Sequence, residues 1–199
     1  MIRHLCTGVM TYQGNGTDLA IVTGMITVRP ARAGDVDRIR RICIEGWRDA
    51  YEGLVPETYI ERSIDAFYGR ERILREIEDH DGWTGWIVAE DGERLLGAGA
   101  GGISRSGVAE LYVLYVDPRR RDEGAGTALL DEVSRRLVTE GATEMWVSVV
   151  KGNEKGIPFY RARRFEVMYE ERAYDSRADE NVIALRMRRQ LPTAGDRPV

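Results

Sequence analysis

The segment from Val116 to Thr127, which reads VDPRRRDEGAGT, constrains the fold of this chain more than any other part of its sequence. A β-rich run ends at Val116, Pro118 breaks it, and an Arg-x-x-Gly-x-Gly turn leads into an amphipathic helix. The first N–H groups of a helix have no partner inside the helix, and the helix dipole adds positive charge there. Gly124 and Gly126 leave these donors accessible. The pattern therefore predicts a strand, an anion-binding turn suited to a pyrophosphate, and a helix in succession.

Two better-known phosphate motifs do not fit this turn. A P-loop requires Lys followed by Ser or Thr after its glycines, and the turn contains no lysine. A dinucleotide-binding fingerprint belongs to the first strand of its domain, whereas this turn follows the fourth β-rich run counted from Ile26. An ordinary glycine-rich helix start with solvated arginines remains the alternative interpretation.

The order of the remaining patterns predicts one α+β domain. Strands are expected at 26–30, 83–90, 95–103, 109–116, 144–150, 165–171 and 182–188. Helices are expected from Asp35 past Cys43 and at 56–68, 70–80, 124–139 and 153–161. Asp91-Gly92 indicates a hairpin. This order favours a three-layer α/β arrangement, in which helices flank a central mixed, mostly antiparallel sheet.

The two ends of the chain differ from this central unit. Residues 1–24 are rich in Gly and Thr and nearly uncharged, so we expect a flexible N-terminal extension, with Met25 as an alternative start. They lack the apolar core and cleavage site of a secretion signal. Residues 192–199 are expected to form a disordered tail. The domain is therefore assigned to residues 25–191.

Charge and composition exclude several classes of function. The net charge of −4 provides no overall basic field for nucleic acid. No apolar run approaches the roughly 18 residues of a membrane-spanning helix. The two cysteines and two histidines are not spaced as metal ligands. We therefore expect a cytoplasmic protein with no metal, no membrane contact and no nucleic-acid partner.

Together with a later motif, the glycine-rich turn resembles the coenzyme A pyrophosphate motif of the GNAT superfamily of acetyl-CoA-dependent N-acetyltransferases. The segment Asn153–Tyr160 is similar to the Asn-x-x-Ala-x-x-Phe-Tyr helix of that family, and Phe165 is similar to the Phe of its closing Gly-Phe. The runs ITVRPA at 26–31 and AELYVLYV at 109–116 are similar to its first and fourth strands. Gly156 and Arg164 depart from the pattern, because alanine and glycine are usual there. The resemblance covers about residues 25–191.

The resemblance implies an acyltransferase. Its expected reaction moves an acetyl group from acetyl-CoA to a primary amine by direct attack in a ternary complex, and the acceptor is a small-molecule amine or a protein amine. A homodimer is also expected, because family members often pair. Two alternatives stay open: a GNAT-fold sensor that binds acyl-CoA without turnover, and a nucleotide-phosphate binder unrelated to coenzyme A.

The resemblance also implies which residues bind the coenzyme. The main chain of Leu114, Tyr115 and Val116 would contact the pantetheine arm, and the Val116 N–H would polarise the thioester carbonyl. Asn153 would hydrogen-bond the arm, although an N-cap role is an equal alternative. The pyrophosphate would lie on the turn formed by Arg121, Asp122, Glu123, Gly124, Ala125, Gly126 and Thr127.

Two residues are the candidates for proton transfer. Tyr160 is the candidate acid that protonates the departing sulfur, with a core aromatic role as the alternative. Glu110 is the candidate base, because it is the single acidic residue in an apolar strand and matches a position where some family members carry a catalytic glutamate. A solvated glutamate, with water as the base, is its alternative.

The acceptor pocket is expected around residues 46–56, where the family commonly places its acceptor-facing wall. Trp47, Tyr51 and Tyr59 would line it, or else pack helix against helix. Nearby acidic residues would attract a cationic amine, or else be solvated: Glu45, Asp49 and Glu52.

Overall fold

The computed structural model describes residues 26–79, 82–105 and 107–192. Within these residues, one seven-stranded sheet has the order β1-β2-β3-β4-β5-β7-β6. Its strands are β1 (Thr27–Pro30), β2 (Ile87–Asp91), β3 (Arg94–Arg105), β4 (Val108–Val116), β5 (Glu144–Val150), β6 (Glu166–Arg172) and β7 (Ile183–Gln190). The β4–β5 pair is parallel, and the other neighbouring pairs are antiparallel. The expected mixed, mostly antiparallel sheet is therefore confirmed.

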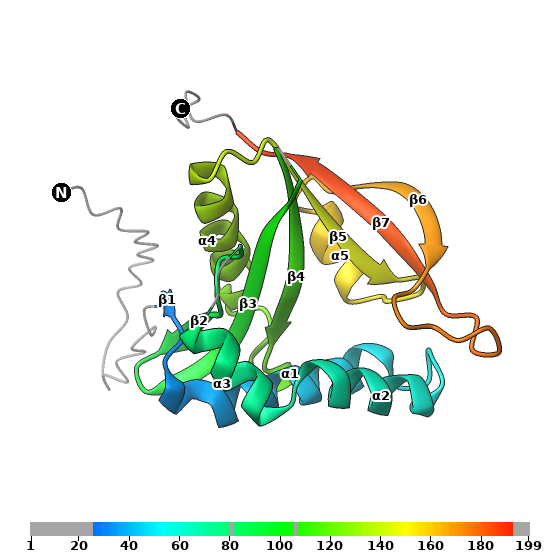
Figure 1. Cartoon of the computed structure of the whole chain (residues 1–199), viewed down its shortest axis with the longest axis horizontal. Helices are drawn as coiled ribbons and strands as arrows, with labels where there is room; N and C mark the ends of the chain where they lie inside the picture. Colours follow the sequence, from blue (N-terminus) through cyan, green and yellow to red (C-terminus); the bar gives the residue numbers. More distant parts are fainter. Residues whose placement is uncertain (1–25, 80–81, 106, 193–199) are drawn as a thin grey trace, which may run out of the picture.

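Helices cover both faces of the sheet and give the protein three layers (Figure 1). One face carries α1 (Val36–Tyr51), α2 (Glu57–Phe67) and α3 (Arg70–Glu78), whose buried apolar side chains include Ile39, Ile60 and Ile73. The other face carries α4 (Ala125–Thr139) and α5 (Gly156–Arg161), and its core includes Leu129 and Met187. Short 3-10 turns, η1 (Ala33–Asp35) and η2 (Pro118–Arg120), precede α1 and α4.

The small residues of β3 allow the central layer to pack tightly. A Cβ atom at Gly97 would lie 2.7 Å from the Tyr115 carbonyl oxygen and 2.9 Å from a methyl of Leu129 on α4. At Gly101 the same atom would lie 2.7 Å from the carbonyl oxygen of Glu110. These distances are too short for any side chain. Glycine at these positions therefore lets β4 and α4 approach β3 closely.

The sheet splits between β4 and β5. The two strands pair from Val108/Glu144 to Leu111/Val147, and no pairing continues beyond that point in the described residues. In Figure 1 the two strands run side by side at the top of the view and diverge downward. The β3–β4 register shifts at the same level, so that Tyr112 forms a bulge. Because a bulge bends its strand, it helps to turn β4 away from β5.

Some local expectations differ from the structure. The strand expected at 83–90 begins at Ile87, because Gly85 adopts φ +69° and interrupts the extended chain, and Trp83 forms only an isolated bridge. Pro56 is the N-cap of α2 rather than part of its first turn. The helix expected from Asn153 begins at Gly156, because the Asn153 side chain accepts from the N–H groups of Lys155 and Gly156 and holds this stretch as a turn.

Other expectations concern parts of the chain that the structure does not describe. The N-terminal extension and the alternative start at Met25 lie outside the described residues, as does the tail apart from Pro192. None of the helices in the described ranges combines the length and apolar character of a membrane-spanning segment.

Candidate active site

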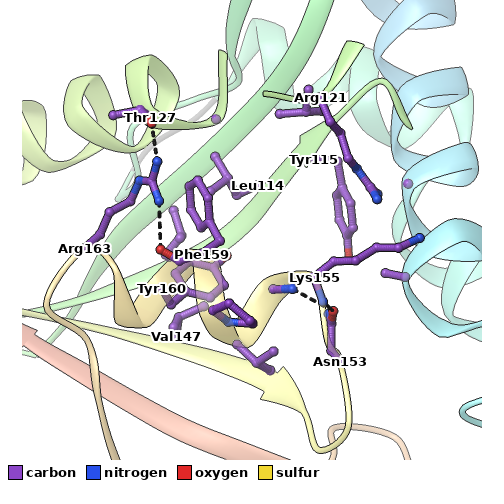
Figure 2. A pocket seen from close by; sticks show the side chains of 18 of the residues that line it. Leu114, Tyr115, Arg121, Thr127, Val147, Asn153, Lys155, Phe159, Tyr160 and Arg163 are labelled. Carbon is purple, nitrogen blue, oxygen red and sulfur yellow. Dashed lines mark hydrogen bonds between the residues drawn. The ribbon is translucent and has the colours of Figure 1, made fainter. Parts of the chain in front are cut away.

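A cavity of about 790 Å³ occupies the split between β4 and β5. The glycine-rich turn and the start of α4 form one wall, and α5 with the preceding loop forms another (Figure 2). The last turns of α1 contribute a third wall. Because β4 and β5 no longer pair with each other here, both strands present backbone edges toward the cavity, and an extended ligand arm can pair with such an edge.

The structure brings most of the predicted coenzyme residues together around this cavity. Ten of them line it: Leu114, Tyr115, Val116, Arg121, Asp122, Gly124, Ala125, Gly126, Thr127 and Asn153. Glu123 is the exception, and its carboxylate instead pairs with Arg120. A turn, a strand end and a helix start thus meet in one place, as the sequence predicted.

The backbone of the turn is left-handed at two positions. Asp122 and Gly124 adopt φ +64° and φ +94°, so the chain reverses sharply before α4 begins. A Cβ atom at Gly126 would lie 3.1 Å from the Phe159 ring, so a side chain there would require the ring to shift. The first residues of α4, Ala125 to Thr127, have short side chains and line the cavity. The N–H groups at this end of the helix, which have no partner inside it, therefore form part of the cavity wall.

Arg163 is a cavity residue that the sequence analysis missed. Its guanidinium stacks 3.7 Å from the centre of the Phe159 ring and donates to the Phe159 carbonyl oxygen at 2.9 Å. It also donates to the Thr127 hydroxyl in the first turn of α4 (Figure 2). Phe159 lies on α5 and Arg163 in the turn that follows it, so their spacing of four residues is only a weak sequence signal for this pair. Arg163 joins α5 to α4 and adds positive charge beside the turn.

Asn153 acts as a cap for the loop that leads into α5. Its Oδ1 accepts hydrogen bonds from the backbone N–H groups of Lys155 at 3.1 Å and Gly156 at 2.7 Å. The Asn153 amide nitrogen would lie 2.8 Å from a Cβ atom at position 156. This contact explains why glycine replaces the usual alanine here. Asn153 therefore caps the N–H groups of the loop that leads to Lys155, the N-cap position of α5, and it also lines the cavity.

Arg164, the second departure from the family pattern, keeps the backbone conformation of the glycine that is usual at this position. It adopts φ +64°, the left-handed conformation that glycine reaches without strain. The turn after α5 therefore keeps the shape that a glycine would allow, and Phe165 is buried as expected.

Tyr160 lines the cavity from α5 and is only 8% exposed. Its ring packs against Phe159 and Phe165. Burial, and secondarily the nearby Tyr51, raise the pKa of the Tyr160 phenol well above its usual value. A phenol in this environment stays protonated, which is the state an acid requires.

The three aromatic residues predicted for the acceptor wall do not share one position. Tyr51 lines the cavity beside Tyr115 and Asn153, with which its phenol interacts. Trp47 and Tyr59 do not line it; they are 8% and 4% exposed and pack between α1 and α2. Trp47 and Tyr59 therefore make the helix-to-helix contacts that were the alternative to lining the acceptor pocket.

Glu110 lies on β4 outside the residues that line the cavity. Its two carboxylate oxygens accept from the two terminal nitrogens of Arg186 on β7 at 2.6 and 2.7 Å. Arg186 reaches across β5, where its guanidinium lies 5.5 Å from the ring centre of Trp146. The carboxylate is thus held in a bidentate ion pair next to the level at which the sheet splits.

Two of the three acidic residues expected near the end of α1, Glu45 and Asp49, are engaged in ion pairs. Glu45 pairs with Arg119 at 2.9 Å. Asp49 accepts hydrogen bonds from Arg121 and from Lys155, the latter at 2.7 Å. Among the described residues, no group of three or more His, Cys, Asp or Glu side chains is arranged to hold a metal ion.

The fold and the site together define an acyltransferase of the GNAT type. Residues 43–165 match the model of the acetyltransferase (GNAT) family, and the chain belongs to this family.

Relatives and solved structures agree with this assignment. An uncharacterized N-acetyltransferase of Bacillus subtilis, YuaI, is 30% identical over 148 residues, which cover 69% of this chain and 79% of that protein. A spermidine N(1)-acetyltransferase of Thermoplasma acidophilum is 26% identical, over 71% of this chain and 89% of that protein. The crystal structure of PaiA N-acetyltransferase from Thermoplasma acidophilum in complex with coenzyme A superposes with a TM-score of 0.70 at 25% identity, covering 83% of this chain and 99% of the other.

Proposed function

We propose that this protein transfers an acetyl group from acetyl-CoA to a primary amine by direct attack within a ternary complex. One observation carries the proposal: the glycine-rich turn, the unpaired strand edges and the Tyr160 phenol all border a single cavity. The names of the relatives as N-acetyltransferases support the same reaction class.

The residues around the cavity suit coenzyme A. Arg121, Lys155 and Arg163 supply positive charge, and the start of α4 supplies N–H groups for a diphosphate. The backbone edges of β4 and β5 suit the amide groups of a pantetheine arm. When bound, acetyl-CoA would supply the activated acyl group, and the chain would supply hydrogen bonds and proton transfer.

Proton transfer requires an acid and a base. Tyr160 is our proposed acid, because its buried phenol lines the cavity and stays protonated. Glu110 is retained as the candidate base, but its bidentate pairing with Arg186 occupies both oxygens. Water as the immediate proton acceptor is therefore the alternative to Glu110.

The thioester carbonyl must also be polarised. We propose that a main-chain N–H of β4 does this, either that of Val116 or one at the Tyr112 bulge.

The acceptor is proposed to be a small cationic amine, with a protein amine as the alternative. The acidic net charge and the spermidine acetyltransferase among the relatives support the first choice. Cytoplasmic location and a homodimer remain predictions, and light scattering on the purified chain tests the second.

The function is tested by measuring thiol release from acetyl-CoA in the presence of an amine panel that includes spermidine, lysine and peptides with free N-termini. We expect thiol release that depends on one class of amine, and mass spectrometry should show an acetylated product. The Gly126→Glu variant is the control, because its side chain would place bulk and negative charge on the turn. Binding of acetyl-CoA without release on any amine would instead support the sensor alternative.

A further inference from the structure

One carboxylate engages two of the cations that border the cavity. Asp49, near the C-terminal end of α1, accepts from a terminal nitrogen of Arg121 through one oxygen and from Lys155 Nζ through the other. Arg121 belongs to the glycine-rich turn and Lys155 to the loop before α5, so Asp49 connects opposite walls of the cavity to α1. Figure 2 shows both side chains extending toward the same helix.

We propose that Asp49 competes with the phosphate groups of coenzyme A for Arg121 and Lys155, and that this competition weakens coenzyme binding and favours release of the product. The inference rests on the proposed function of the cavity. It assigns to Asp49 a role that differs from attracting the amine, because the carboxylate is already engaged on the coenzyme side.

The electrostatic argument begins with the charge of Asp49. Partial burial opposes its ionisation, but the hydrogen bond from Lys155 and the charge of Arg121 outweigh this and lower the pKa of Asp49. The carboxylate is therefore charged at neutral pH. Its side chain is 27% exposed and that of Arg121 is 33% exposed, so solvent screens the pair only in part. Because the negative charge of Asp49 offsets the positive charge of Arg121, Arg121 attracts an approaching phosphate less strongly.

The competition is local, because the neighbouring ion pair does not involve the cavity. Glu45 lies one helical turn before Asp49 and pairs with Arg119, which precedes Arg121 in the same turn. Arg119 does not line the cavity, and its side chain is 62% exposed. Glu45 is therefore a matched control for Asp49, because both carboxylates lie on α1 and each pairs with an arginine of the segment 119–121.

The test compares Asp49→Asn with Glu45→Gln in the full-length protein. Isothermal titration measures the affinity of each for coenzyme A and for pantetheine, which has the same arm and no phosphates. We expect Asp49→Asn to bind coenzyme A about twofold to fivefold more tightly, as expected for removing one partly screened competitor. Its affinity for pantetheine should not change, and Glu45→Gln should match the wild type for both ligands.

A second background tests whether the effect passes through the two cations. In a variant that carries Arg121→Gln and Lys155→Gln, adding Asp49→Asn should no longer tighten binding of coenzyme A. Thermal unfolding of each variant checks that the fold is kept, and Asp49→Ser serves in place of Asp49→Asn if that variant is unstable.

The outcomes separate this inference from the proposed function. Unchanged or weaker binding of coenzyme A by Asp49→Asn would overturn the competition, and so would an equal gain for pantetheine or for Glu45→Gln. Failure of the wild-type protein to bind coenzyme A at all would instead overturn the proposed function.

Discussion

Burial determines the chemistry of Tyr160 at the scale of a single residue. The phenol sits among Phe159 and Phe165, and desolvation disfavours its charged form. A tyrosine in water has a pKa near 10, whereas this phenol holds its proton to higher pH. Cys43, on the buried face of α1, is subject to the same effect, and burial raises the pKa of its thiol. Of these two residues, only Tyr160 lines the cavity.

Replacing Tyr160 with phenylalanine should lower kcat by about 10²-fold or more, because general acid catalysis contributes on that order. The affinity for coenzyme A should change little, since the ring that packs against its neighbours is kept. Steady-state kinetics and titration with coenzyme A make the comparison. Tyr174→Phe is the control, because that tyrosine is 77% exposed in the loop after β6 and does not line the cavity. Equal kcat values in wild type and Tyr160→Phe would remove this residue as the acid.

At the scale of elements, the position of α4 depends on the glycines of β3. Helix α4 begins at the glycine-rich turn, so the distance of α4 from the sheet also sets where this turn lies. Gly97 is the closest point of contact, since its missing side chain leaves room for both the β4 backbone and Leu129. Packing of this kind tolerates no added methyl group without a shift of the backbone.

The Gly97→Ala variant should lower the free energy of unfolding by about 1–3 kcal/mol, which is typical of an overfilled core position. Urea unfolding measures the change. Gly34→Ala is the matched control, because a Cβ atom at Gly34 meets nothing within 4 Å, and we expect a change within about 0.5 kcal/mol. If the two variants have equal stability, the close contact is not what requires glycine in β3.

At the scale of the whole molecule, the split sheet is held together at two levels. The β4–β5 pairing joins the halves at one end of the cavity. Toward the other end, Arg62 of α2 reaches the loop between β6 and β7, where it donates to Glu180 at 2.6 Å and to Asp175 at 2.9 Å. The Tyr59 hydroxyl donates to the Tyr174 carbonyl oxygen of the same loop at 3.0 Å. The helices of one half thus anchor the loop of the other.

The Arg62→Gln variant should loosen this connection between the halves. Hydrogen exchange of the amides in residues 173–182 should become faster, on the order of tenfold, because several charged hydrogen bonds are lost together. Arg48→Gln is the control: Arg48 pairs with Glu57 and Glu61 and so links α1 to α2 within one half. Loop exchange that rises equally in both variants would show that Arg62 has no special role in joining the halves.

The sequence predicted those features whose cause is local. The signals for the turn and α4 are adjacent in the chain: a proline after a strand, two glycines and the start of an amphipathic pattern. The turn and α4 therefore follow from short-range rules. The mostly antiparallel sheet followed from strand order and hairpin signals in the same way. The resemblance to GNAT proteins then supplied the candidate coenzyme residues, most of which the structure places around one cavity.

The sequence did not predict contacts between residues far apart in the chain. Asp49 and Lys155 meet because α1 crosses the end of the split, and Glu110 is held by Arg186 because β7 lies beyond β5. The types and spacing of side chains do not predict these ion pairs, because each carboxylate could pair with many different arginines or lysines.

The amino-acid sequence alone therefore determined the kind of turn, the order of the elements and the family. The tertiary structure decided which charges neutralise one another and which aromatic side chains reach the cavity. The physical reason is distance: turn and helix preferences act over a few bonds, whereas ion pairing and desolvation depend on which surfaces the folded chain brings together.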